Sequence, residues 1–161
     1  MRQAAVIGFS VLLLLLLQVT VLPILFSAAV HLDLLLILTV SSGLLFGREK
    51  AVGVGFLSGL LQDLAAGSLF GLHTLSKMAI GYLSGLAEQK VFKEHILLPM
   101  AAMLLATLLN SGLLLIFLAV FGYRYELSGV VAGEFFPSLP YNLLFSIPVH
   151  QTVYRLSKRW E

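Results

Sequence analysis

Long apolar runs separated by short polar turns are the feature that most restricts how this chain can fold. A transmembrane helix needs about 20 predominantly apolar residues, and the runs here approach or exceed that length. We place them at residues 4–26, 30–46, 51–66, 70–89, 96–121 and 140–156. Only 11% of the 161 residues are charged, against about 25% in an ordinary soluble domain. The sequence therefore predicts an all-α polytopic membrane protein, a single transmembrane domain of six helices over residues 1–161.

The basic residues indicate which way these helices run. If the N-terminus is cytoplasmic, eight basic residues fall in cytoplasmic segments, namely Arg2, Arg48, Lys50, Lys90, Lys93, Arg155, Lys158 and Arg159. Arg124 alone would lie outside, and Lys77 lies within a run. Because cytoplasmic loops carry an excess of Lys and Arg, we predict that both termini are cytoplasmic. The net charge of +2 is therefore a sign of topology and not of nucleic-acid binding.

The first run allows a second interpretation, as a secretory signal that is removed. Arg2 precedes this run, and the small residues 27–29 resemble a cleavage site. The apolar part of a signal covers only about 7–15 residues, and this run is longer. We therefore predict a retained helix, in whose last turn Pro23 can introduce a kink.

The third and fourth runs carry two rows of small and charged residues that repeat every four positions. The rows are Gly55, Gly59, Asp63 and Gly67, then His73, Lys77, Gly81 and Gly85. Residues four apart share one face of a helix. Folding the chain about Phe70 brings the rows together as Gly55 with Gly85, Gly59 with Gly81, Asp63 with Lys77, and Gly67 with His73. Small residues let membrane helices approach closely, so we predict a tight hairpin with an ion pair near its outer end.

Five ionisable residues are predicted in the outer half of the membrane or at its outer edge: Asp33, Asp63, His73, Lys77 and Glu134. Such residues are rare within membranes and usually functional, so they could surround an outward-facing polar pocket. The alternative is a structural ion pair that fixes the register of the hairpin. We favour this second interpretation, because a carboxylate and an ammonium that face each other satisfy each other.

The remaining polar residues suggest packing more than chemistry. Asn110 and Asn142 can form hydrogen bonds between helices, and His150 is expected at the wet inner interface. In the outer loop, residues 122–139, a short amphipathic helix is expected at the membrane surface. Pro137 and Pro140 would end it and turn the chain back into the membrane.

The motifs of common enzymes and cofactor sites are missing from the sequence. There is no cysteine, and we find no nucleotide-binding glycine loop, metal-ligand cluster or nucleophile motif. We therefore expect neither catalytic residues nor a metal or other cofactor.

One stretch resembles a known family. The pattern Gly53-x-Gly55-Phe56-x-x-Gly59-Leu60-x-x-Asp63, followed by Gly67, Gly71-Leu72 and Gly81-Tyr82-Leu83-x-Gly85, is similar to that of the rod shape-determining membrane protein MreD family. Asp33 followed by Leu34-Leu35-Leu36 is similar as well, although family members often have Pro-Asp where this chain has Leu32-Asp33.

The resemblance implies a non-enzymatic scaffold in the cytoplasmic membrane of a bacterium. Its expected partner is MreC, a single-span scaffold protein of the cell-elongation complex. MreB, RodA and a class B penicillin-binding protein are the other expected components of that complex, which builds lateral peptidoglycan.

Two other functions remain open from the sequence. The family resembles the small-molecule-binding subunits, or S-components, of energy-coupling-factor vitamin transporters, which would hold a ligand against the outer polar residues. A proton or ion carrier would use the same acidic residues. The single tryptophan, Trp160, lies in the predicted cytoplasmic tail. Because the outer side lacks a cluster of aromatic residues for a ligand, we favour the scaffold.

Overall fold

A computed structural model of the chain describes residues 2–25, 32–67, 70–87, 97–122 and 136–158. These residues are helical, and no strand occurs among them. The elements are α1 (Arg2–Leu16), a π-turn η1 (Leu17–Val21), α2 (Leu22–Leu25), α3 (Leu34–Phe46), α4 (Arg48–Ala66), α5 (Leu72–Leu86), α6 (Leu97–Val120) and α8 (Phe136–Ser157). Counting α1, η1 and α2 as one continuous rod, the described residues form a helix at each of the six predicted runs.

By length and composition, two of the described helices can cross a membrane without help from neighbours. They cover Val6–Ile24 and Pro99–Val120. The apolar helix α3 is shorter, with 13 residues, or about 20 Å at the usual rise per residue. The hydrocarbon core of a bilayer is about 30 Å thick, so α3 is shorter than that core.

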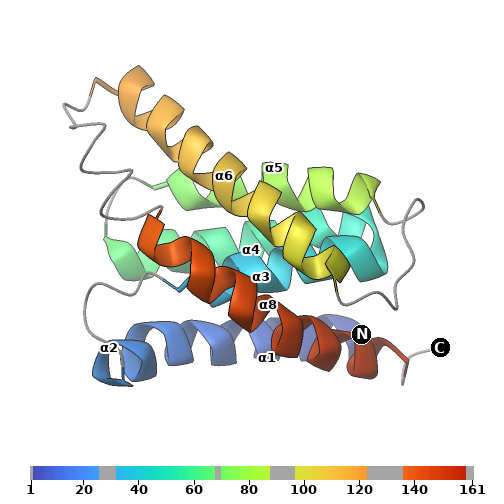
Figure 1. Cartoon of the computed structure of the whole chain (residues 1–161). Coiled ribbons are helices and arrows are strands. Elements are labelled where there is room, and N and C mark those ends of the chain that lie inside the picture. Colours follow the sequence, from blue (N-terminus) through green and yellow to red (C-terminus); the bar gives the residue numbers. More distant parts are fainter. Residues whose placement is uncertain (1, 26–31, 68–69, 88–96, 123–135, 159–161) are drawn as a thin grey trace.

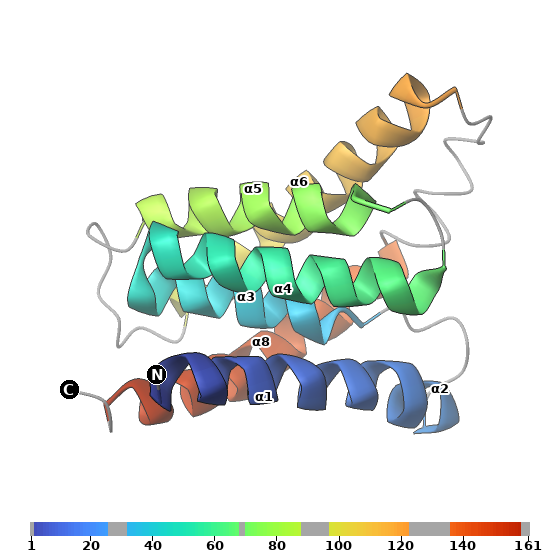
Figure 2. The ribbon, with the colours of Figure 1, turned by 180° about the vertical axis from the view of Figure 1, so that it is seen from behind.

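The helices pack as a bundle around α3 (Figures 1 and 2). α3 packs against the α4–α5 hairpin and against α8, and α1 lies along both α3 and α4 (Figures 1 and 2). Residues 34 to 45 of α3 are all buried. The start of α1 and the end of α8 lie at the same end of the bundle, beside the turn between α3 and α4 (Figures 1 and 2). The far half of α6 leans away from the other helices (Figure 1).

The glycines of the hairpin bring α4 and α5 into backbone contact. An added Cβ at Gly55 would lie 2.5 Å from the carbonyl oxygen of Lys77, and one at Gly81 would lie 2.6 Å from that of Ala51. Both distances are too short for any side chain. Gly59 and Gly85 lie equally close to the opposite backbone. The close approach that the sequence predicts is therefore present at four of the five glycines.

The predicted register of these glycines is wrong. Gly55 lies against Lys77 and not against Gly85, and Gly59 lies against Thr74. Gly55 was predicted to face residue 85 and instead faces residue 77, and Gly59 faces residue 74 instead of 81. Both differences correspond to a shift of about two helical turns. Each glycine row packs on the backbone of the other helix and not on the other glycine row.

The turn between the helices explains this shift. Gly67, predicted as a packing glycine, instead ends α4 in the left-handed conformation (φ 60°), and an added Cβ there would meet no atom within 4 Å. Gly71 is also left-handed (φ 98°) and precedes α5. Glycine adopts this conformation without steric cost. The chain therefore reverses so sharply that α5 begins beside the last turns of α4.

Two features of the proline-containing helices differ from expectation. Instead of a simple kink at Pro23, the rod contains the π-turn before it, where the backbone N–H of Leu22 donates to the carbonyl of Leu17. Pro137 and Pro140 lie inside α8, which begins at Phe136. Pro137 is the second residue of α8, where the N–H groups have no helical partner. Pro140 lies past the first turn, so its ring removes one hydrogen bond from the helix. The amphipathic helix predicted in the outer loop falls largely on residues 123–135, outside the described residues.

The backbone contact between α4 and α5 predicts a difference between two neighbouring glycines. Gly55→Ala should lower the free energy of unfolding by about 1–3 kcal/mol, because the helices must separate. Gly53→Ala is the matched control: its added Cβ meets no atom within 4 Å, so stability should hold or rise by up to about 1 kcal/mol. Denaturant unfolding in micelles measures both. Equal stability of the two variants would contradict the packing.

Candidate functional site

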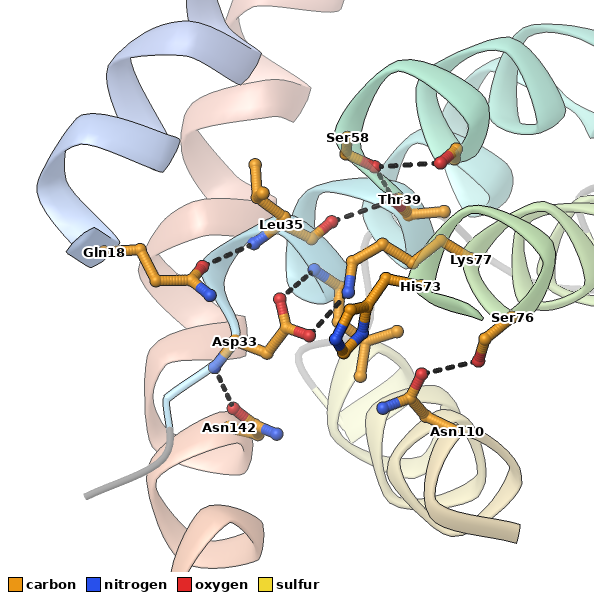
Figure 3. A network of polar contacts seen from close by, with 12 residues as sticks. Gln18, Asp33, Leu35, Thr39, Ser58, His73, Ser76, Lys77, Asn110 and Asn142 are labelled. Atoms are coloured by element: carbon orange, nitrogen blue, oxygen red, sulfur yellow. Dashed lines mark hydrogen bonds and ion pairs between the residues drawn. The ribbon is translucent and has the colours of Figure 1, made fainter. Parts of the chain in front are cut away.

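The first turn of α3 is buried inside the bundle, and side chains from three elements satisfy its backbone N–H groups (Figure 3). Asp33 caps its own helix, with Oδ1 accepting from the N–H of Leu36 at 2.9 Å. Asn142 of α8 accepts from the N–H of Asp33 at 3.0 Å, and Gln18 of η1 accepts from the N–H of Leu35 at 3.4 Å. A buried backbone group without a partner is costly in a membrane, so these contacts allow α3 to begin within the bundle.

The same Asp33 forms an ion pair with Lys77 of α5. Lys77 Nζ donates to Asp33 Oδ2 at 2.6 Å, and the Lys77 side chain is 0% exposed and that of Asp33 16% exposed. His73, one turn before Lys77, lies beside the pair (Figure 3). The ion pair therefore joins α3 to α5 next to the capped end of α3.

The predicted pairing of Lys77 with Asp63 is wrong. Asp63 is fully buried and accepts from the N–H groups of Gly71, His73 and Thr74 at 2.9, 3.0 and 3.1 Å. It also accepts from the Thr74 hydroxyl at 2.6 Å. A carboxylate at a helix N-terminus accepts the free N–H groups and suits the positive end of the helix dipole. Because α5 is shifted by two turns, Asp63 meets the start of that helix and not its ammonium.

Three further pairs extend these contacts to α6 and α4. Ser76 of α5 donates to Asn110 of α6 at 2.6 Å, and Asn142 of α8 donates to Thr107 of α6 at 3.5 Å. The predicted hydrogen bonding of Asn110 and Asn142 between helices is thus confirmed. Thr39 of α3 and Ser58 of α4 share a hydrogen bond at 3.2 Å. We refer to these contacts, with those of Gln18, Asp33 and Lys77, as the polar layer.

Several members of the polar layer were not singled out from the sequence. Gln18, Thr39, Ser58, Ser76 and Thr107 each stand in an apolar helix. A polar residue in such a helix needs a partner, and that signal identifies them as contact residues. It does not identify their partners, which lie between 17 and 35 positions away.

The other predicted residues are less informative. Glu134 lies outside the described residues. His150, expected at a wet interface, is instead only 5% exposed, and neither of its ring nitrogens has a hydrogen-bond partner in the described part of the chain. No group of three or more His, Cys, Asp and Glu side chains within the described ranges could hold a metal ion.

The polar layer holds helices together. Its acceptors and donors are directed at backbone groups or at one another, as are those of the neighbouring cap Asp63, and neither Lys77 nor Asp63 has exposed surface. Such an arrangement fixes the positions of helices within a membrane, where unpaired polar groups are unstable.

A family model described as rod shape-determining protein MreD matches residues 2–160. The chain belongs to the MreD family. Comparisons with curated proteins and with solved structures find no match. Membership supports a role in rod shape determination and makes this chain part of a family of membrane proteins. The polar layer and the glycine contacts are thus features of one member of the MreD family.

The ion pair of this MreD-family chain can be tested with a double-mutant cycle. Lys77→Met should lower the free energy of unfolding by about 3–5 kcal/mol, because it leaves the Asp33 carboxylate without its partner. Asp33→Asn removes the charge but keeps an acceptor for the Leu36 N–H. The double variant should therefore lose less than the sum of the single variants by at least about 1 kcal/mol. Denaturant titration in micelles gives the four values.

The control for this cycle is the pair that the structure separates. Asp63→Asn and Lys77→Met should be additive within about 0.5 kcal/mol, because these residues share no contact. Coupling between positions 63 and 77 that exceeds the coupling between 33 and 77 would contradict the ion pair described here.

The cap on α5 gives an independent prediction. Asp63→Ala leaves the N–H groups of Gly71, His73 and Thr74 without their acceptor. We expect a loss of about 2 kcal/mol, the upper end of the range for helix caps, because the site is buried. Asp63→Asn retains one acceptor oxygen and should lose less. Thermal unfolding followed by circular dichroism compares the two, and equal losses would show that the backbone contacts contribute little.

Proposed function

We propose that this chain is a non-enzymatic scaffold of the bacterial cell-elongation complex. In this proposal it forms one transmembrane domain of six spans in the cytoplasmic membrane, with both termini on the cytoplasmic side. Its direct partner is MreC, and the complex includes MreB, RodA and a class B penicillin-binding protein. Membership of the MreD family supports the link to rod shape.

The observation that carries the proposal is how the buried charged groups are used. Lys77 binds Asp33, and Asp63 binds the start of α5. A catalytic or ligand-binding site needs polar groups that converge on a substrate. In the described residues these groups instead converge on other helices, which favours a rigid scaffold.

The outer surface of the described helices suits a membrane scaffold as well. Large apolar side chains are exposed along α1 and α6, among them Phe9, Leu12, Leu105, Ile116 and Val120. Exposed apolar surface of this extent marks contact with lipid or with a partner protein. A single-span partner needs such an apolar face to pack against within the bilayer.

Recovery of partners tests the function. When an affinity-tagged chain is purified from a rod-shaped bacterium in mild detergent, we expect MreC to be recovered with it. Gly81→Leu should reduce this recovery, because the hairpin cannot close around a side chain at that position. Gly53→Leu is the control and should retain it, since the position is open. Recovery of two ATPases and their coupling membrane subunit would instead support a vitamin transporter subunit.

The orientation can be tested separately, because the chain contains no cysteine. A cysteine introduced at Glu49, which is exposed at the α3–α4 turn, should react with an impermeant maleimide only after the cells are permeabilised. A cysteine at Ala66, exposed at the other end of α4, should react in intact cells. The reverse pattern would contradict the proposed orientation and would leave the family assignment unchanged.

A further inference from the structure

Two lysines lie over aromatic rings at the end of the bundle where α1 begins and α8 ends. Lys50 Nζ lies 5.5 Å from the centre of the Phe46 ring, and Lys158 Nζ lies 4.7 Å from that of Tyr154. Both distances fall within the range of cation–π contacts, about 6 Å. The aliphatic part of each lysine thus follows an aromatic surface while its ammonium group is exposed, as is usual at a membrane interface.

Both rings belong to the same part of the core. Phe46 and Tyr154 pack against one apolar cluster made by α1, α3, α4 and α8, consisting of Val11, Leu35, Leu38, Leu45, Val54 and Val153. Lys50 lies in the first turn of α4 and Lys158 directly follows α8. The start of α4 and the end of α8 lie at the same end of the bundle (Figures 1 and 2). Arg48 and Arg155 are exposed at this end and add positive charge. We refer to Lys50 and Lys158 as the lysine rim.

An open apolar strip begins one helical turn beneath Lys50. Gly53 is exposed, and an added Cβ there would meet no atom within 4 Å. The next turn of α4 exposes Phe56 (44%) and Leu57 (42%). Residues 50, 53 and 57 share one face of the helix. An extended hydrocarbon chain can therefore lie along this face without displacing any side chain.

We propose that the lysine rim binds an anionic phospholipid, with its phosphate at Lys50, Lys158 adding positive charge at the same end of the bundle, and an acyl chain along Gly53, Phe56 and Leu57. Lysines at the membrane edge attract anionic lipid headgroups. The apolar strip beside Lys50 can hold an acyl chain, which a lipid has and a soluble phosphate lacks. This site goes beyond the scaffold role. It depends neither on MreC nor on the orientation in the cell.

The binding of phosphatidylglycerol to the purified full chain in micelles tests this site. Native mass spectrometry gives the dissociation constant, with phosphatidylcholine as the neutral comparison. We expect phosphatidylglycerol to bind more tightly than phosphatidylcholine. In the double variant Lys50→Gln with Lys158→Gln, the dissociation constant for phosphatidylglycerol should rise by about fivefold for each lysine removed. The control, Lys90→Gln with Lys93→Gln, removes the same amount of charge. It should leave the dissociation constant within about twofold of that of the parent chain.

The apolar strip is tested with a matched pair of glycines. Gly53→Leu fills the strip and should weaken phosphatidylglycerol binding. Gly112→Leu in α6 is the control, since an added Cβ at Gly112 also meets no atom within 4 Å. Both substitutions occupy open positions and replace glycine in a helix, so both variants should remain folded.

Four results would overturn the proposal. If both lysine double variants weaken phosphatidylglycerol binding equally, the lipid is attracted by overall charge and not by the lysine rim. If both glycine variants weaken it equally, the strip on α4 does not hold the acyl chain. Stabilisation by inorganic phosphate equal to that by the lipid would identify a soluble anion as the ligand. Binding of polyglutamate that requires the lysine rim, while phosphatidylglycerol binding does not, would identify an acidic protein segment instead.

Discussion

A carboxylate that starts a helix inside a membrane protein must find a partner, and the arrangement of this MreD-family chain follows from how Asp33 does so. Its side chain caps α3 and binds Lys77, while its backbone N–H donates a hydrogen bond to the side-chain oxygen of Asn142. These three contacts bring α5 and α8 to the same turn of α3. Because an unpaired charge or backbone group is unfavourable in hydrocarbon, losing any one of the contacts disturbs the other helices as well.

The glycines of the hairpin make that ion pair possible. Gly55 places the backbone of α4 directly against the backbone of Lys77, so α5 is held at a fixed height along α4. Asp63 then fixes the start of α5 through three of its N–H groups. Close packing and capping thus set the position of Lys77, and the ion pair with Asp33 ties the hairpin to α3.

The helices and their close contact could be predicted from the sequence, but their register could not. Each described helix lies within a few residues of a predicted apolar run, and Gly55 and Gly81 lie at the contact as expected. A pattern that repeats every four residues looks much the same after a shift of seven or eight, since both shifts return to nearly the same face of a helix. The pattern therefore shows which face meets the other helix but not at which height.

The partner of Lys77 was missed for a related reason. Asp33 and Lys77 are 44 positions apart, and their meeting depends on how α3 packs against the hairpin. That packing involves apolar residues such as Ile37, Val40 and Ile80, which form one cluster. Their order in the sequence carries no information on distance in space. Asp63 was predicted at a depth similar to that of Lys77 and Asp33 at a shallower one, so the depth estimate favoured the wrong carboxylate.

The distance of Asp33 from Lys77 along the chain has a consequence for synthesis. Asp33 leaves the ribosome well before Lys77, and before Asn142 by a still longer interval of 109 positions. Until these residues are made, Asp33 has neither its counter-ion nor the acceptor for its own backbone N–H. At 13 residues, α3 is also short for an independent span. The contacts that fix its start within the bundle are therefore complete only after α8 has been made.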